Sequence, residues 1–191
     1  PNGANTSAVF AGTNPNNGKR YVYLETLGGG MGARFTKDGK DGVQVHLTNT
    51  SNLPVEAIEM EYPLRVEEYS FVENSGGAGK YRGGLGIRRR IRPIAHKCEF
   101  SGVGERFKHS PWGVFGGQPG KPGKFYLKHK NGKITNLSSK SSSIYTNEND
   151  AIVMETPGAG GYGNPKKRSK NNILKDKISG KFSNSFLKKY Y

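Results

Sequence analysis

The residues best suited to chemistry gather in one short polar segment, 46–52. His46 lies in an alternating run over 43–47 and is followed by Thr48, Asn49 and Asn52. A strand over 43–47 would turn its three apolar residues to one face and His46 to the other. Imidazole, hydroxyl and amide groups at one strand end can line a polar site. The competing interpretation is a histidine that only makes structural hydrogen bonds.

The other potential ligands and nucleophiles form no such group. His96, His109 and His129 lack the H-x-x-x-H and H-E-x-x-H spacings that bring zinc ligands together. Cys98 is the only cysteine, which excludes an intramolecular disulfide and a cysteine-based zinc site. We interpret it as a small buried residue of a strand. No G-x-S-x-G nucleophile elbow occurs. The sequence therefore indicates no metal site and no Ser or Cys nucleophile.

Two glycine clusters match the pattern of the dinucleotide-binding fingerprint. Residues 158–163 fit G-x-G-x-x-G, and residues 28–33 fit the looser form that ends in alanine. A true fingerprint needs a helix whose N-terminus meets the pyrophosphate. Pro165 and a loop-like stretch over 34–39 follow the clusters instead. We therefore interpret both as backbone packed against backbone, which glycine permits.

The predicted elements are mostly strands. Alternation and turn residues predict strands over 8–10, 20–27, 43–47, 64–72, 87–94 and 151–155, and a further strand over 99–103 that can pair with 87–94. Asn131-Gly132 predicts a hairpin with a two-residue type I′ turn. Helix is expected after Pro54, over 55–60, and again beyond 169. The fold class is mainly β (α+β): a glycine-rich β-sheet body, with short helices mostly in the C-terminal tail.

Charge divides the chain into two expected units, a β-rich body over 1–163 and a basic, helical tail over 164–191. The chain carries a net charge of +15, and the tail alone holds nine Lys/Arg and one Asp. Residues 53–75 hold six Glu and one Arg. Because the tail also has apolar residues at helical spacing, we expect it to dock on an acidic surface of the same assembly. Those residues are Ile173, Leu174, Ile178, Phe182, Phe186 and Leu187.

A stripe of three arginines is the other basic feature. Arg88, Arg90 and Arg92 alternate along one predicted strand. A solvated face, or a face that meets an acidic partner, is preferred here to phosphate binding. No signal peptide and no apolar run near 18 residues is present, so the expectation is a cytoplasmic protein without a membrane partner. A nucleic-acid partner is not expected either, because slightly more than half of the excess positive charge lies in the short tail.

Seven segments form a colinear series of motifs. They read ETLGGGMGA at 25–33, DGVQVHLTNT at 41–50, NLPVE at 52–56, EYPLRV at 61–66, SGGAGKYRGGLG at 75–86, PWG with GGQPG at 111–120, and ETPGAGGYG at 155–163. In this order they resemble the B-type subunit of the hydantoinase/5-oxoprolinase family, and the resemblance extends over nearly the whole chain.

The resemblance implies that the chain is part of a larger enzyme assembly. An A-type subunit with an actin-like ATP site phosphorylates the substrate, and the B-type subunit completes ring opening of a cyclic amide such as 5-oxoproline or a hydantoin. The implied partners are this A-type subunit and the remaining N-terminal part of the B-type subunit, where the family has its metal cluster. ATP and a divalent metal then belong to the whole assembly, with none bound by this chain alone, and the isolated chain is expected to be inactive.

Within that interpretation the polar segment lines the active-site cleft. The candidate catalytic residues are His46, Asn49, Glu56 and Glu61, and the candidate substrate-binding residues are Glu25, Thr48 and Asn52. The alternative is that these residues only cap a turn and the following helix. Two other functions stay open: ATP-dependent carboxylation of a ketone within the same family, and a non-enzymatic basic binding module.

Overall fold

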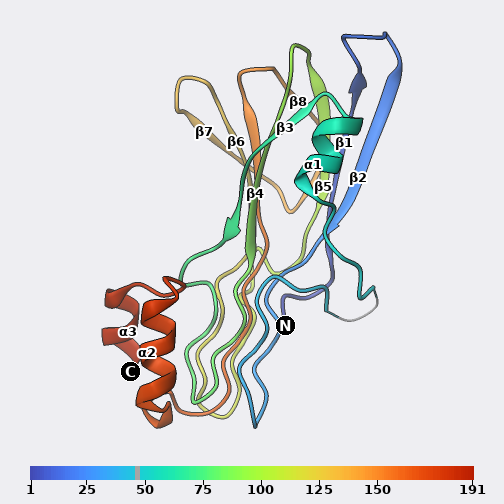
Figure 1. The fold of residues 1–191 in the computed structure, drawn as a ribbon. Coiled ribbons are helices and arrows are strands. Elements are labelled where there is room, and N and C mark those ends of the chain that lie inside the picture. Colours follow the sequence, from blue (N-terminus) through green and yellow to red (C-terminus); the bar gives the residue numbers. More distant parts are fainter. Residues whose placement is uncertain (46–47) are drawn as a thin grey trace.

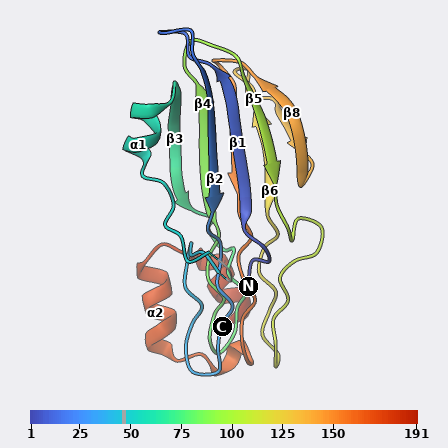
Figure 2. The ribbon, with the colours of Figure 1, turned by 90° about the vertical axis from the view of Figure 1, so that its right-hand side faces the viewer.

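The computed structural model describes residues 1–45 and 48–191, and it forms two stacked antiparallel sheets above a layer of glycine-rich segments (Figure 1, Figure 2). One sheet has the order β2-β1-β5-β8 and the other β3-β4-β9-β6-β7. The strands are β1 Thr6–Thr13, β2 Arg20–Leu27, β3 Leu64–Phe71, β4 Ile87–Pro93, β5 Cys98–Val103, β6 Lys124–Lys128, β7 Ile134–Leu137, β8 Lys140–Thr146 and β9 Ala151–Glu155. The predicted class, mainly β with late helices, is confirmed.

The core between the sheets is aromatic and aliphatic. Alternate residues face inward on strands such as β1, β4 and β5, so that Phe10 and Phe100 from one sheet meet Ile91 and Phe125 from the other. Phe100 has its ring centroid 5.1 Å from that of Phe10 and 5.8 Å from that of Phe125. Helix α1, Val55–Glu61, inserts the buried Ile58 into the same cluster. It follows Pro54 and ends before Pro63, as expected.

Three local predictions were wrong. Strand β5 pairs with β1 and β8 rather than with β4, because the chain crosses to the other sheet between the two strands. The described part of 43–47 is no strand, since only Val43 forms an isolated bridge, to Gly29. The β6–β7 hairpin exists, but only Gly132 of its turn has a positive φ, whereas a type I′ turn needs two. His129 and Lys133 close a three-residue loop instead.

The glycine-rich layer, which we define as residues 28–42, 75–86, 111–122 and 156–163, contains extended segments that hydrogen-bond through their backbones (Figure 1). A Cβ on Gly84 would lie 1.8 Å from the carbonyl oxygen of Lys40, and one on Gly30 would lie 2.2 Å from that of Gly84. Neighbouring backbones therefore approach so closely that no side chain fits. Both fingerprint-like clusters lie inside this layer, and the amide of Gly161 already donates to the carbonyl of Gln118.

The tail packs on one side of the glycine-rich layer (Figure 1). A short 3₁₀ helix, Pro165–Lys167, leads into α2, Lys170–Ile178, and α3, Asn184–Tyr190. Phe182 and Leu187 bury themselves against Leu85 of the layer. Leu174 and Ile178 behave differently from the other apolar tail residues, because they stay 53% and 76% exposed.

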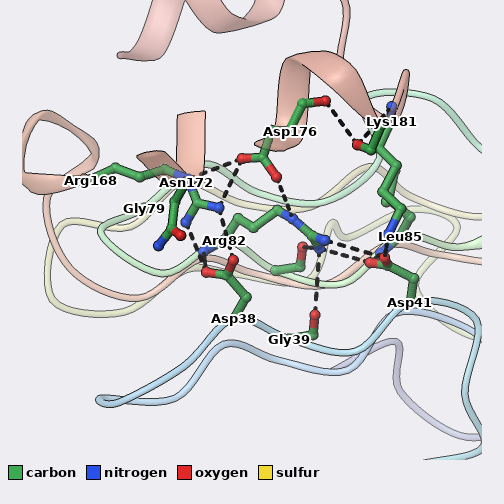
Figure 3. Close-up of polar contacts among 12 residues, drawn as sticks. Asp38, Gly39, Asp41, Gly79, Arg82, Leu85, Arg168, Asn172, Asp176 and Lys181 are labelled. Atoms are coloured by element: carbon green, nitrogen blue, oxygen red, sulfur yellow. Dashed lines mark hydrogen bonds and ion pairs between the residues drawn. The ribbon is translucent and has the colours of Figure 1, made fainter. Parts of the chain in front are cut away.

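A buried charge network fastens the tail to the layer (Figure 3). Asp176 of α2 pairs with Arg82 at 3.2 Å and with Arg168 at 2.8 Å. Arg168 also pairs with Asp38 at 2.8 Å, while Arg82 and Lys181 both reach Asp41 at 2.7 Å. The basic tail thus meets acidic residues of its own chain.

The arginine stripe of β4 is likewise paired within the chain. Arg88 contacts Glu155 at 2.7 Å and Glu68 at 3.2 Å, and Arg92 contacts Glu67 at 2.7 Å. Arg90 also lies 3.0 Å from Glu67. The acidic stretch after Pro54 therefore supplies most of the stripe's counter-charges.

Candidate functional site

A buried ion pair contacts Leu53, the residue directly after the polar segment. Glu25 and Arg89 face each other from β2 and β4, with side chains 5% and 0% exposed, and their nearest atoms are 2.6 Å apart. Glu25 also accepts hydrogen bonds from the amide of Leu53, at 2.8 Å, and from the hydroxyl of Tyr23. Both carboxylate oxygens are therefore occupied, as a buried charge requires.

Two aromatic side chains enclose this pair. The guanidinium of Arg89 stacks over the ring of Tyr69, 4.1 Å from its centroid. Burial, together with the Glu25 carboxylate, raises the pKa of Tyr23 well above its ordinary value. Tyr23 therefore stays a neutral hydrogen-bond donor to Glu25 at physiological pH.

An amide network, which we define as Asn5, Gln44, Thr48, Asn52 and Tyr69, extends from this pair toward the surface. Asn52 accepts from the amide of Gly28 at 3.1 Å and donates to the Tyr69 hydroxyl at 2.7 Å. Gln44 donates to Asn52 at 3.3 Å and accepts from Thr48 at 3.1 Å. Asn5 donates to Thr48 at 2.9 Å. The network joins the chain's first residues, the loop before α1 and strand β3.

The structure brings three of the predicted residues together and leaves the others apart. Thr48 and Asn52 belong to the amide network, and Asn52 lies one residue from Leu53, which contacts Glu25. Asn49 is exposed with a φ of +46°. Its side chain, and those of Glu56 and Glu61 on α1, make no hydrogen bond or ion pair with any other described residue, and the two glutamates are also exposed. His46 lies outside the described residues.

The sequence prediction missed Arg89, and it missed Gln44 and Tyr69 in the network. Arg89 could have been found from the sequence, because it lies two residues from both Ile87 and Ile91. On a strand, residues two apart share a face, so Arg89 must face inward on β4. A lone arginine among inward-facing residues needs a buried carboxylate. Tyr69 is harder to find, since its role depends on Asn52, seventeen residues away, through the packing of β3.

The described residues offer little to a metal ion. No three His, Cys, Asp or Glu side chains among residues 1–45 and 48–191 gather as a ligand set. The side chains of these described ranges thus do not fit a divalent metal, and we assign them no step through one. In the same described ranges, no helix is both long and apolar enough to cross a membrane.

Comparison with known proteins decides the family. The family model described as Hydantoinase B/oxoprolinase matches residues 1–165. The chain belongs to this family. An uncharacterised protein of Methanocaldococcus jannaschii is 48% identical over 166 residues, which make up 87% of this chain and 29% of that protein. A Pseudomonas protein named as a candidate B-type subunit of a D-/L-hydantoinase is 34% identical over 179 residues, and the 5-oxoprolinase of Dictyostelium discoideum is 40% identical over 141.

The chain covers only part of these relatives: 30% of the Pseudomonas protein and 11% of the Dictyostelium enzyme. Two solved structures share its fold. Acetone carboxylase superimposes with a TM-score of 0.82 at 19% identity, over 97% of this chain and 29% of that one. The ATP-dependent caprolactamase of Pseudomonas jessenii gives 0.79 at 23% identity, over 98% of this chain and 35% of that one.

Proposed function

We propose that this member of the hydantoinase B/oxoprolinase family is one part of an ATP-dependent hydrolase that opens cyclic amides of the hydantoin or 5-oxoproline type. The support is its family membership, together with relatives at 34% and 40% identity named for hydantoinase and 5-oxoprolinase activity. Amide hydrolysis is preferred to ketone carboxylation because the carboxylase is similar only in fold.

The chain supplies one wall of the active site in this proposal. The observation that carries it is the exposed polar rim above a rigid base: Thr48 and Asn49 at the surface, and Asn52 held through its amide to Gly28 and Tyr69. The Thr48 hydroxyl and the Asn52 amide are held in place by hydrogen bonds, and the Asn49 amide is exposed beside them in the sequence. In the proposal these groups hydrogen-bond the carbonyl of a ring or the charge that develops on it. Glu56, in the first turn of α1, and Glu61 at its end are exposed carboxylates of the helix that follows this segment. In the proposal one of them orients His46 or acts as a base.

The remainder of the site comes from outside the chain. The A-type subunit contributes ATP and the phosphorylation step, and the rest of the B-type fold contributes the divalent metal. The relative named as one subunit of a hydantoinase supports a multisubunit assembly. Within that assembly, this chain's own residues bind the ring carbonyl, orient it and transfer a proton.

The test is substrate-dependent ATP hydrolysis by the assembled complex with 5-oxoproline, hydantoin, or acetone plus bicarbonate. His46→Ala and Asn49→Ala should each lower kcat at least about tenfold, or roughly 1.4 kcal/mol in barrier, with assembly and folding intact. Glu148→Ala, which removes an exposed carboxylate just after β8, serves as the control. Parent rates in both variants would mean that the segment is structural. Activity with acetone plus bicarbonate, and with neither cyclic amide, would contradict the hydrolase and support the carboxylase.

The isolated chain is expected to be inactive in the same assay. Neither ATP hydrolysis nor 5-oxoproline opening should exceed the buffer blank, because the proposal places nucleotide and metal elsewhere. Turnover that copurifies with the chain alone, and is lost in the Asn49→Ala variant, would contradict this division of labour.

A further inference from the structure

The buried Glu25–Arg89 pair holds one residue of the loop before α1 by both of its backbone polar groups. Glu25 accepts a hydrogen bond from the Leu53 amide at 2.8 Å, and Arg89 donates to the Leu53 carbonyl at 3.3 Å. Each backbone group thus meets a charged partner, and hydrogen bonds to charged groups are stronger than neutral ones. Because Leu53 follows Asn52 directly, the pair fixes the backbone at the end of the polar segment.

Arg89 also reaches Asn52 by a second route, through Tyr69. The Arg89 guanidinium lies 4.1 Å from the centroid of the Tyr69 ring, and the Tyr69 hydroxyl accepts a hydrogen bond from the Asn52 amide nitrogen at 2.7 Å. That nitrogen carries two hydrogens, while Gly28 and Gln44 donate to the amide oxygen. Among the described residues, the second N–H of Asn52 therefore has no acceptor. In the proposed function it is the group that meets the ring carbonyl.

Arg89 itself does not meet a substrate. Its side chain is 0% exposed within this chain alone, and further parts of a longer protein can only cover it more. Stability alone does not account for the ion pair, because apolar residues of similar volume in place of a buried pair are often as stable or more so. The effect of Arg89 on a site must therefore pass through the neighbours that it holds, Leu53 and Tyr69.

We propose that Arg89 is a positioning residue of the active site, which fixes the loop before α1 so that the second N–H of Asn52 points at the ring carbonyl of the substrate. Glu25 and Tyr69 act with it. The inference rests on the proposed function, since it explains how that site is held. Arginine suits this role because its planar fork can pair with a carboxylate, donate to a carbonyl and stack on a ring at the same time. A displacement of about 1 Å in a positioned group can cost on the order of 100-fold in rate.

The first variant is Arg89→Lys, measured in the assembled complex with 5-oxoproline. Lysine keeps a positive charge opposite Glu25 but loses the planar fork and the stacked contact, so kcat should fall about tenfold or more. Arg82→Lys is the matched control. Arg82 is also buried, pairs with two carboxylates and lies 5.4 Å from the centroid of the Phe182 ring, between the glycine-rich layer and the tail (Figure 3). It should lose stability like Arg89→Lys and keep kcat within about twofold of the parent.

A double-mutant cycle separates positioning from a merely structural role. If Arg89 acts through Asn52, then Asn52→Ala should lower kcat to a similar extent, and Arg89→Lys added to it should lower kcat no further. A loss of folded enzyme would multiply the two effects instead. Tyr69→Phe removes only the hydroxyl that Asn52 meets, so it tests the second route even if Arg89→Lys does not fold. Its control is Tyr21→Phe, which removes a hydroxyl bound to His96 at the other end of β2.

Hydrogen exchange of the chain tests the same contacts without a substrate. The Leu53 amide, followed by NMR, should exchange about tenfold faster or more in Arg89→Lys than in the parent or in Arg82→Lys. Effects that multiply in the cycle, or a Leu53 amide that exchanges at the parent rate, would overturn the positioning role and leave amide hydrolysis by the parent complex standing. If the complex turns over acetone plus bicarbonate and neither cyclic amide, the proposed function fails. The same cycle run with acetone then decides the positioning role by itself.

Discussion

The two-sheet body and the glycine-rich layer are held together in different ways. In the body, large side chains fill the space between two sheets, with Phe10, Phe100 and Phe125 all at most 1% exposed. In the layer, carbonyls and amides of neighbouring segments meet directly, and a Cβ at Gly84 would overlap the carbonyl of Lys40. A side-chain core can rearrange around a change in volume, whereas a backbone core has no soft groups that can move. The layer should therefore be the less tolerant region.

The largest expected effect is that of Gly84→Ala. The new methyl group would lie 1.8 Å from the Lys40 carbonyl oxygen and 2.8 Å from the Met31 amide nitrogen, so two backbone segments must separate. We expect a loss above roughly 5 kcal/mol, with no folded chain recovered. Gly132→Ala, where a Cβ meets no atom within 4 Å but φ is +83°, should cost only about 1–2 kcal/mol. Similar melting temperatures for Gly84→Ala and Gly132→Ala would show that the layer tolerates an added methyl group as well as an open turn of the body does, which would contradict the prediction.

The next effect belongs to the body. Phe100→Ala empties a site between Phe10 and Phe125, and we expect it to cost roughly 3–5 kcal/mol in the free energy of unfolding. Urea unfolding followed by circular dichroism measures the loss. The variant should still unfold in a single transition, since neighbouring rings can partly close the space. A loss larger than that of Gly84→Ala would reverse the proposed order.

A smaller effect is expected where the layer meets the tail. Burial alone would raise the pKa of Asp41, but Arg82, Lys181 and the amide of Leu85 outweigh it and hold the pKa below its ordinary value of 3.8. The Asp41 contribution to stability is therefore complete above about pH 4 and is lost as pH falls further. Asp41→Asn should cost about 3 kcal/mol at pH 7.

The same variant should lose part of the acid dependence that the parent shows below pH 4. Unfolding curves from pH 2 to 7 give the comparison, with Glu148→Gln as an exposed control. An unchanged acid profile would show that other carboxylates dominate. Because the network fastens α2, tryptic cleavage in the tail should also become faster in Asp41→Asn.

The smallest effect is expected from Ile91→Val. Ile91 is fully buried in the body, and removal of one methyl group there should cost roughly 0.5–1.5 kcal/mol. The comparison with Gly84→Ala is direct, since one variant removes a methyl from a side-chain core and the other adds one to a backbone core. Denaturant midpoints with unchanged m-values would measure it.

Much of the fold was predictable from local pattern. Alternation placed β2, β3, β4 and β9, and Pro54 with Pro63 bounded α1, because these signals depend on neighbouring residues alone. The candidate site was less accessible. Thr48 and Asn52 were identified by residue type, but their link to Gln44, Tyr69 and the Glu25–Arg89 pair depends on how the loop before α1 folds onto β2, β3 and β4.

The sequence by itself determined the family, the strand-rich class and the fact that glycine clusters pack backbone against backbone, because motif order and the absence of Cβ atoms are properties of the chain. Only the tertiary structure decided which charges pair. Arg168 pairs with Asp38, which lies 130 residues away in the sequence, and Arg89 of one sheet pairs with Glu25 of the other. Charges act through space and are strong only where burial removes water, so their partners follow from packing and cannot be read from spacing.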